Sequence, residues 1–127
     1  MQKYYLQTDP VRIPAQNNKV IEEHFGLQST KSSDYSIARM SAPAGWEEPF
    51  QTPEFDEIIL MGAGSLRADV DGKILEISGG ESLLVRKGVR VQYSNPFNET
   101  AEYWSICIPA FSPDSAHREY DGEKKQR

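Results

Sequence analysis

Between residues 36 and 108 the chain is divided into short β-prone stretches, with no room for a long helix. The expected strands cover residues 36–42, 57–61, 65–70, 73–77, 82–85, 89–93 and 101–108. Glycine and proline turns separate them, and Asp71-Gly72 has the composition of a two-residue hairpin turn. About seven short strands between such turns predict an all-β domain, either a sandwich or a small barrel.

The segments on either side of this region are less regular. Residues 1–34 are polar and interrupted by prolines, and Val20–Phe25 fits one helical turn or a short strand equally well. We expect residues 1–34 to form an extension with added strands and residues 35–110 to form the core. Residues 111–127 are expected to be partly a lid or tail, and their last ten residues to be disordered or draped on the surface.

Composition and charge limit the classes of protein. The 127 residues fit one domain, and 14 Lys and Arg against 19 Asp and Glu give a net charge of −5. This balance argues against a nucleic-acid partner, because phosphate binding needs clustered cations. The longest apolar run, residues 58–61, is too short to span a bilayer, and no signal-peptide core follows the first residues. A single cysteine, Cys107, excludes an internal disulfide. We therefore expect a cytoplasmic protein without membrane or nucleic-acid partners.

Two spaced motifs are more specific than the composition. The first runs G-x5-Q-x-P-x3-E-x6-G from Gly45 to Gly64, and the second runs G-x5-R-x-G-x2-V-x3-N from Gly80 to Asn95. Both match the two cupin motifs in spacing and order, so the chain resembles a small single-domain cupin (RmlC-like) over about residues 36–108. This resemblance implies an antiparallel double-stranded β-helix, the jelly-roll barrel. Gly64 and Gly88 are expected to close turns that need positive φ.

The chain departs from the cupin pattern at the metal site. In cupins the first motif usually supplies two histidines and a glutamate, and the second supplies a third histidine, all on one divalent metal. The matching positions here are Gln51, Pro53, Glu57 and Val91. Since proline and valine side chains cannot ligate and a glutamine oxygen is a weak ligand, we expect no tightly bound metal and no cofactor.

A finer resemblance concerns Gly45–Pro49 and Gln51–Glu57. These stretches are similar to ethanolamine-utilisation-type cupins, which also tend to lose the histidines while keeping an aromatic-Asp-Glu sequence before the strand. Cupins of this size usually pair into dimers, so the resemblance also implies a homodimer.

Two residues are the candidate catalytic groups. In the cupin register Glu57 points into the barrel, where it could be a metal ligand, a general base or simply a buried, hydrogen-bonded carboxylate. Tyr93 shares a strand face with Val91 and would therefore also face inward. Its hydroxyl could bind a ligand or be satisfied within the core.

Five further residues are candidate substrate-binding groups. Gln51 and Glu54 lie in the loop where metal-binding cupins place their ligands, and Trp46 lies at the expected barrel rim. Arg39 would bind a carboxylate if it faced inward and would be a surface group otherwise. His117 follows the last strand, on a segment that could fold over the barrel mouth or remain exposed.

The sequence-based hypothesis for function is a small-molecule-binding cupin that takes a small polar organic molecule. Its enzymatic form would be a metal-independent isomerase or lyase using Glu57. One alternative is a metal-dependent cupin enzyme with altered ligands from Glu57, Gln51, Glu54 and His117. The other is a non-enzymatic assembly partner of an ethanolamine-utilisation-like pathway.

Overall fold

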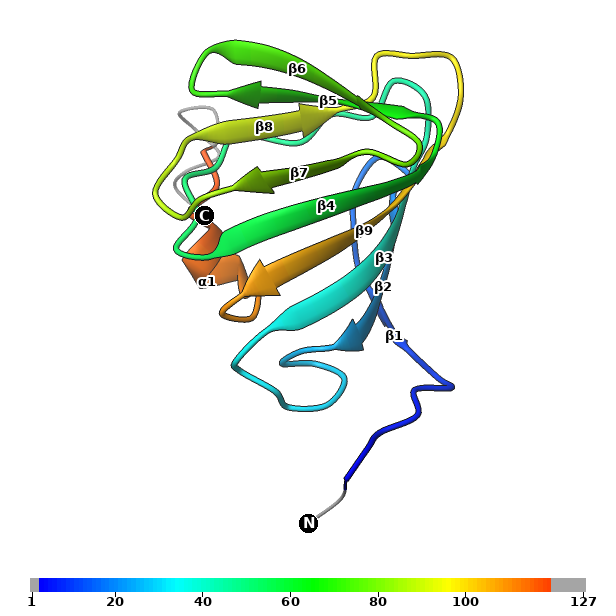
Figure 1. Cartoon of the computed structure of the whole chain (residues 1–127), viewed down its shortest axis with the longest axis vertical. Helices are drawn as coiled ribbons and strands as arrows, with labels where there is room; N and C mark the ends of the chain where they lie inside the picture. The colour runs from blue at the N-terminus through cyan, green and yellow to red at the C-terminus, as the bar shows by residue number, and fades with distance from the viewer. Residues whose placement is uncertain (1–2, 120–127) are drawn as a thin grey trace.

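The computed structural model of the protein describes residues 3–119 and consists almost entirely of β-strands (Figure 1). In chain order the strands are β1 (Val11–Ile13), β2 (Val20–Phe25), β3 (Ser36–Ala42), β4 (Asp56–Ala63), β5 (Ser65–Val70), β6 (Lys73–Ser78), β7 (Ser82–Val85), β8 (Val91–Ser94) and β9 (Ala101–Ile108). One helical turn, α1 (Pro113–Ala116), follows them. The ambiguous segment Val20–Phe25 is therefore a strand, because it pairs with β1 on one side and β3 on the other.

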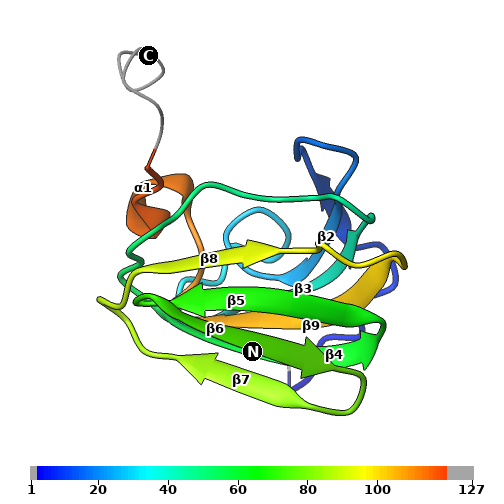
Figure 2. The same cartoon turned by 90° about the horizontal axis from the view of Figure 1, so that it is seen from above.

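The strands form two facing antiparallel sheets (Figures 1 and 2). The larger sheet has the order β1-β2-β3-β9-β4-β7, and the smaller has the order β6-β5-β8. This arrangement confirms the predicted antiparallel jelly-roll class. The two strands before residue 34 extend the larger sheet beyond β3.

Side chains along the strands alternate between the interior and the outer face of each sheet, and the inward-facing ones form the core. In β9 every second residue is buried, from Ala101 to Cys107, and in β4 Glu57, Ile59 and Met61 face the same interior. The main core lies between the sheets and includes Leu66 and Val91, which are fully shielded from solvent. Because Glu57 alternates in phase with these apolar residues, the fold places a carboxyl group inside the barrel.

Two glycine turns have the geometry expected from the motifs. Gly64 has φ +72° and Gly88 has φ +83°, which confirms the positive φ predicted for both. A Cβ atom on Gly64 would lie 2.4 Å from the carbonyl oxygen of Thr100. The Asp71-Gly72 hairpin is also confirmed, with positive φ at both residues.

The ends of β4, β6 and β8 differ from the predicted ones, by a single residue in β6. Strand β4 is longer than residues 57–61, and β8 begins at Val91 rather than at residue 89. The later start of β8 arises because the turn after β7 continues to Val89, whose N–H donates to the carbonyl of Arg86 at 3.3 Å. The predicted disorder of the last ten residues falls mostly on residues 120–127, outside the described residues. In the described part of the chain, no helix is long and apolar enough to cross a membrane.

Candidate functional site

A cavity of about 210 Å³ opens at one end of the barrel and is called the Lys19 cavity below. The loop between β1 and β2 forms one wall, and the segment Trp46–Pro49 forms another. Lys19, Trp46, Glu48 and Arg118 are among its lining residues, so the cavity combines one aromatic ring with charges of both signs.

Glu57 is buried beside this cavity, on the inner face of β4. Its Oε2 accepts a 2.5 Å hydrogen bond from the hydroxyl of Ser105 on the neighbouring strand β9. Its Oε1 is also buried and has no hydrogen-bond partner among the described residues. Burial raises the pKa of Glu57, and the bond from Ser105, the charge of Lys19 and the nearby Tyr93 hydroxyl oppose this effect.

Glu48 is the second carboxyl group of the cluster. It follows Trp46 in the first motif, and its backbone N–H donates to the carbonyl of Tyr93. Loss of hydration raises the pKa of Glu48 to about 7, an effect that the positive charge of Lys19 opposes. Within the described residues Glu48 Oε2 has no hydrogen-bond partner. A carboxyl group of this kind exchanges its proton near neutral pH.

Lys19 supplies a positive charge next to both carboxyl groups. Its ammonium lies 4.0 Å from the centre of the Trp46 ring and 5.5 Å from that of Tyr103. Burial lowers the pKa of Lys19, while the charges of Glu48 and Glu57 raise it. The buried Trp46 ring therefore holds the ammonium by a cation–π contact, at the point where its charge acts on both acids.

Tyr93 faces the interior, as expected for a residue that shares a strand face with Val91. It is 3 % exposed, and its buried hydroxyl has no hydrogen-bond partner among the described residues. Burial raises the pKa of Tyr93 well above its usual value, so the hydroxyl stays protonated and can donate. By distance and angle Glu48, Glu57 and Tyr93 each keep a buried polar atom without a hydrogen bond among the described residues, but the Tyr93 hydroxyl and the Glu57 carboxyl group lie close enough to shift each other's pKa.

The residues at the cupin metal positions do not fit a metal. Gln51 pairs with Val91 through backbone hydrogen bonds in both directions, and its side-chain oxygen accepts a 3.4 Å bond from Arg118. Of the four matching positions only Glu57 has a charged donor group, and one carboxylate does not form a stable site for iron or zinc. Over residues 3–119 there is no group of three or more His, Cys, Asp or Glu side chains arranged to hold a metal ion.

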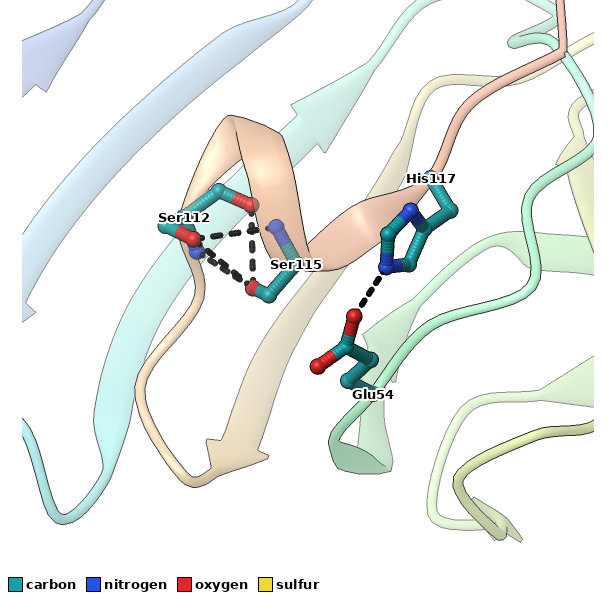
Figure 3. A network of polar contacts seen from close by, with 4 residues as sticks. All are labelled: Glu54, Ser112, Ser115 and His117. Carbon is teal, nitrogen blue, oxygen red and sulfur yellow. Dashed lines mark hydrogen bonds and ion pairs between the residues drawn. The ribbon is translucent and has the colours of Figure 1, made fainter.

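Glu54 and His117 meet at the protein surface, away from this cluster. His117 Nε2 contacts Glu54 Oε2, as Figure 3 shows, and both side chains are at least half exposed. A capping box between Ser112 and Ser115 starts the short helix α1 that precedes His117. Backbone bonds from Thr52 to His117 and from Glu54 to Ser115 attach this segment to the loop before β4. The contact between His117 and Glu54 therefore attaches the C-terminal segment to the loop before β4.

Arg39 lies on the outer face of the larger sheet. Its guanidinium forms ion pairs with Glu22 on β2 and Glu102 on β9, at 3.0 and 2.9 Å. Since Ala38 and Ala42 of the same strand face the interior, Arg39 cannot reach the Lys19 cavity. The candidate role of Arg39 in substrate binding is corrected on this ground.

Four members of the cluster were missed by sequence reasoning: Lys19, Glu48, Ser105 and Arg118. Lys19 lies in a polar loop with no periodic pattern, and Arg118 is in the irregular C-terminal segment. Glu48 had one available signal, because it stands three residues after the first motif glycine. The alternation in β9 could have placed Ser105 on the inner face.

Solved structures with the same fold include an RmlC-like cupin from Shewanella frigidimarina, which is 13% identical, with a TM-score of 0.71 over 90% of this chain and 96% of that one. Ethanolamine utilization protein Q from Salmonella typhimurium is 19% identical, with a TM-score of 0.58 over 73% and 71% of the two chains. A Streptomyces protein, a PAC13 variant with uridine, is 13% identical, with a TM-score of 0.72 over 98% of both chains. At these identities the likeness shows the fold alone.

Sequence comparison adds one curated relative, and no family model matches the chain. The relative, from Myxococcus xanthus, is named endoribonuclease YbeY and is 47% identical over 107 residues. The matched part is 84% of this chain but 36% of the relative, so the chain spans about a third of the protein that it matches.

This relative corrects the functional hypothesis drawn from the sequence. The prediction of a cupin for a small polar molecule, the assignment to an ethanolamine-utilisation-like pathway and the exclusion of nucleic acid are wrong, because the relative is named for RNA cleavage. The charge argument failed because a net charge of −5 is a sum over the whole chain and gives no information on local cations such as Lys19. The homodimer stays a prediction from the resemblance.

Proposed function

We propose that this chain, a small cupin domain of the RmlC-like type, acts in RNA processing. In this proposal the Lys19 cavity binds one ribonucleotide unit of an RNA substrate. The name of the Myxococcus xanthus relative supports a role with RNA. Because the match covers about a third of that relative, RNA binding is the main proposal and RNA cleavage by this domain is a second candidate.

The observation that carries the proposal is the group of unused polar atoms beside the cavity. In the described part of the chain, Glu48 Oε2 is buried without a hydrogen-bond partner, and Glu57 Oε1 and the Tyr93 hydroxyl are buried next to each other without a well-formed hydrogen bond. Leaving such a group unsatisfied costs about 1–3 kcal/mol, which a ligand with matching donors and acceptors recovers. The hydroxyls of a ribose can donate to the two carboxylates and accept from the tyrosine. The 2′-hydroxyl also distinguishes RNA from DNA.

Cations at the same cavity favour a phosphate next to the sugar. Lys19 and Arg118 both line the cavity, and the charges of both act on Glu48 and Glu57. A net charge of −5 opposes binding of a long stretch of RNA backbone with many phosphates. We therefore propose that the cavity binds a single nucleotide unit of a strand. The solved structure of the Streptomyces PAC13 variant with uridine supports the idea that a fold of this size accommodates a nucleoside.

The test is a comparison of short single-stranded oligonucleotides with the same sequence in RNA and DNA. We expect the labelled RNA to bind at least tenfold more tightly by fluorescence anisotropy. Glu48→Gln and Lys19→Met should each reduce RNA binding at least fivefold. The controls are Glu76→Gln and Lys73→Met on β6, which carry the same charge changes far from the cavity in an exposed hairpin. Equal binding of RNA and DNA, or equal losses in the controls, would contradict the proposal.

A second candidate function is RNA cleavage by this domain itself. It is favoured by the position of Glu48, whose pKa of about 7 suits a general base, next to a second carboxyl group. The 2′-hydroxyl would lose its proton to the Glu48 carboxylate and attack the adjacent phosphorus. The P–O5′ bond would then break, the 5′-oxygen would take a proton from Glu57, and a 2′,3′-cyclic phosphate would form. Analysis of the products from end-labelled RNA incubated with EDTA tests this step, which Glu48→Gln should abolish.

A further inference from the structure

A second cavity, about 460 Å³ in volume, lies on the inner face of the larger sheet and is called the inner chamber below. It opens between β1 and the segment that follows β9. Its walls are mostly apolar and include Ile13, Ala38 and Phe111. A volume of this size far exceeds a packing defect and falls within the range of ligand pockets.

Two polar groups of the inner chamber, Ser36 and Glu23, are already bonded within the protein. Ser36 Oγ accepts a 3.0 Å bond from the backbone N–H of Phe111. Glu23 Oε2 accepts bonds from the backbone N–H groups of Gln28 and Ser29 and from the Ser29 hydroxyl. Burial raises the pKa of the Cys107 thiol, which therefore stays neutral. Arg12 also lines the chamber, from an exposed position on β1, and the other walls favour a ligand group with mainly apolar surface.

One wall of the inner chamber is a fixed aromatic ring. Phe111 packs edge-on against the buried Phe55, with 5.8 Å between ring centres, and its backbone is held by Ser36. A ring supported in this way is a suitable surface for stacking a planar heterocycle.

The inner chamber and the Lys19 cavity are adjacent and share part of their lining. Pro14 and Ile21 line both. Ser105 lines the chamber and donates to Glu57, which belongs to the charged cluster beside the Lys19 cavity. Arg118 lines the Lys19 cavity, and its guanidinium lies 5.5 Å from the centre of the Phe111 ring. An apolar compartment therefore adjoins a carboxylate cluster, which in turn adjoins two cations.

This order corresponds to the parts of a nucleotide. We infer that the inner chamber receives the base of the ribonucleotide whose sugar contacts Glu57 and Glu48 and whose phosphate contacts Lys19 and Arg118. The inference rests on the proposed function and adds the substrate class, an unstacked nucleobase held by apolar contact and by stacking on Phe111. RNA-binding proteins commonly recognise bases that have left the stack in this way.

The experiment compares three ligands by isothermal titration calorimetry: adenosine 5′-monophosphate, uridine 5′-monophosphate and ribose 5-phosphate. Ribose 5-phosphate has the sugar and phosphate but no base, so it tests the Lys19 cavity alone. We expect both nucleotides to bind at least tenfold more tightly than ribose 5-phosphate. Ala38→Leu, which fills the chamber, should remove this difference and leave the affinity for ribose 5-phosphate unchanged.

Two further variants keep the experiment decisive. Phe111→Leu retains an apolar contact with Phe55 but removes the stacking surface, and it replaces Ala38→Leu if that variant has lost its cooperative thermal unfolding. Ala44→Leu makes the same volume change at an exposed turn and serves as the matched control.

The outcomes separate the two proposals. Equal affinity of the wild-type protein for all three ligands would overturn the inner-chamber inference and leave the proposed function standing. No binding of any of the three would overturn both. If Ala44→Leu removes the advantage of the base as fully as Ala38→Leu does, the base lies outside the inner chamber.

Discussion

Ser105 Oγ on β9 donates a 2.5 Å hydrogen bond to Glu57 Oε2 on β4, while Glu57 Oε1 has no partner among the described residues. The two residues are far apart in the sequence and come together because β4 pairs with β9 in the larger sheet. One half of the carboxylate is thus held by the Ser105 bond, and the carboxyl group also interacts with the nearby Tyr93 hydroxyl.

The first prediction concerns this bond. Ser105→Ala should destabilise the protein by about 1–3 kcal/mol at pH 8, since it leaves a buried carboxylate without its donor. The loss should become smaller as the pH falls, because burial raises the pKa of Glu57 and protonation removes the charge that needs the donor. Urea unfolding at pH 8 and at lower pH values measures the difference, and Ser82→Ala on the exposed β7 position is the control. A loss that does not depend on pH would show that the hydroxyl does not act through the Glu57 charge.

The second prediction is a fall in stability with rising pH. The pKa of Glu48 is raised to about 7 in the folded protein, against 4.5 for an ordinary carboxyl group. Between these values the folded protein holds a proton that the unfolded chain has released. The stabilising contribution is therefore complete below pH 4.5 and disappears as the pH rises through 7.

This change is expected to amount to roughly 2 kcal/mol, because partial exposure reduces the full effect of the pKa shift. Urea unfolding between pH 4.5 and 8 measures it, and Glu48→Gln should flatten the decrease. Glu47→Gln, at the exposed neighbouring position, should leave the slope unchanged. A slope that Glu48→Gln leaves intact would mean that the titrating group lies elsewhere.

The third prediction uses two glycines with similar backbone angles. Gly64 has φ +72° and Gly80 has φ +87°, but only at Gly64 would an added Cβ meet another atom, the Thr100 carbonyl oxygen at 2.4 Å. Gly80→Ala should cost about 1 kcal/mol from backbone strain alone. Gly64→Ala should cost at least about twice as much, because the backbone of two segments must move apart. Chemical denaturation of both variants provides the comparison, and equal losses would contradict the close approach at Gly64.

The fourth prediction restores the missing ligands. Gln51→His, Pro53→His and Val91→His together should create a metal site with Glu57, since all four positions are buried and Gln51 pairs directly with Val91. Titration of the untagged variant with Co²⁺ should give visible absorption bands at about one metal per chain. The same triple variant with Glu57→Gln should bind more weakly. Absence of bands in the triple variant would show that these side chains do not converge.

Much of the fold could be predicted because its signals are local. The Asp71-Gly72 turn, the spacing of the motif glycines and the alternation around Glu57 each depend on a few neighbouring residues and on the period of a strand. The predicted β8 start failed for a local reason as well, because turn geometry extended to Val89.

The candidate site was less accessible to this reasoning. Glu57 and Tyr93 were found because they occupy known register positions on strands. For Arg39 the sequence left both faces open, because alternation does not tell which face of a strand is the inner one; the packing of the two sheets, which buries Ala38 and Ala42, decides it.

The sequence by itself determined the strand class of this protein, its turns and the loss of the histidine ligands, because each follows from residue type and short-range spacing. Only the tertiary structure brought Lys19, Glu48, Glu57 and Arg118 to one end of the barrel. These residues come from two loops, a strand and the C-terminal segment, and no local pattern links them. Their chemistry also depends on burial, because removal from water shifts the pKa values of the two acids and of Lys19, and burial exists only once the sheets have packed.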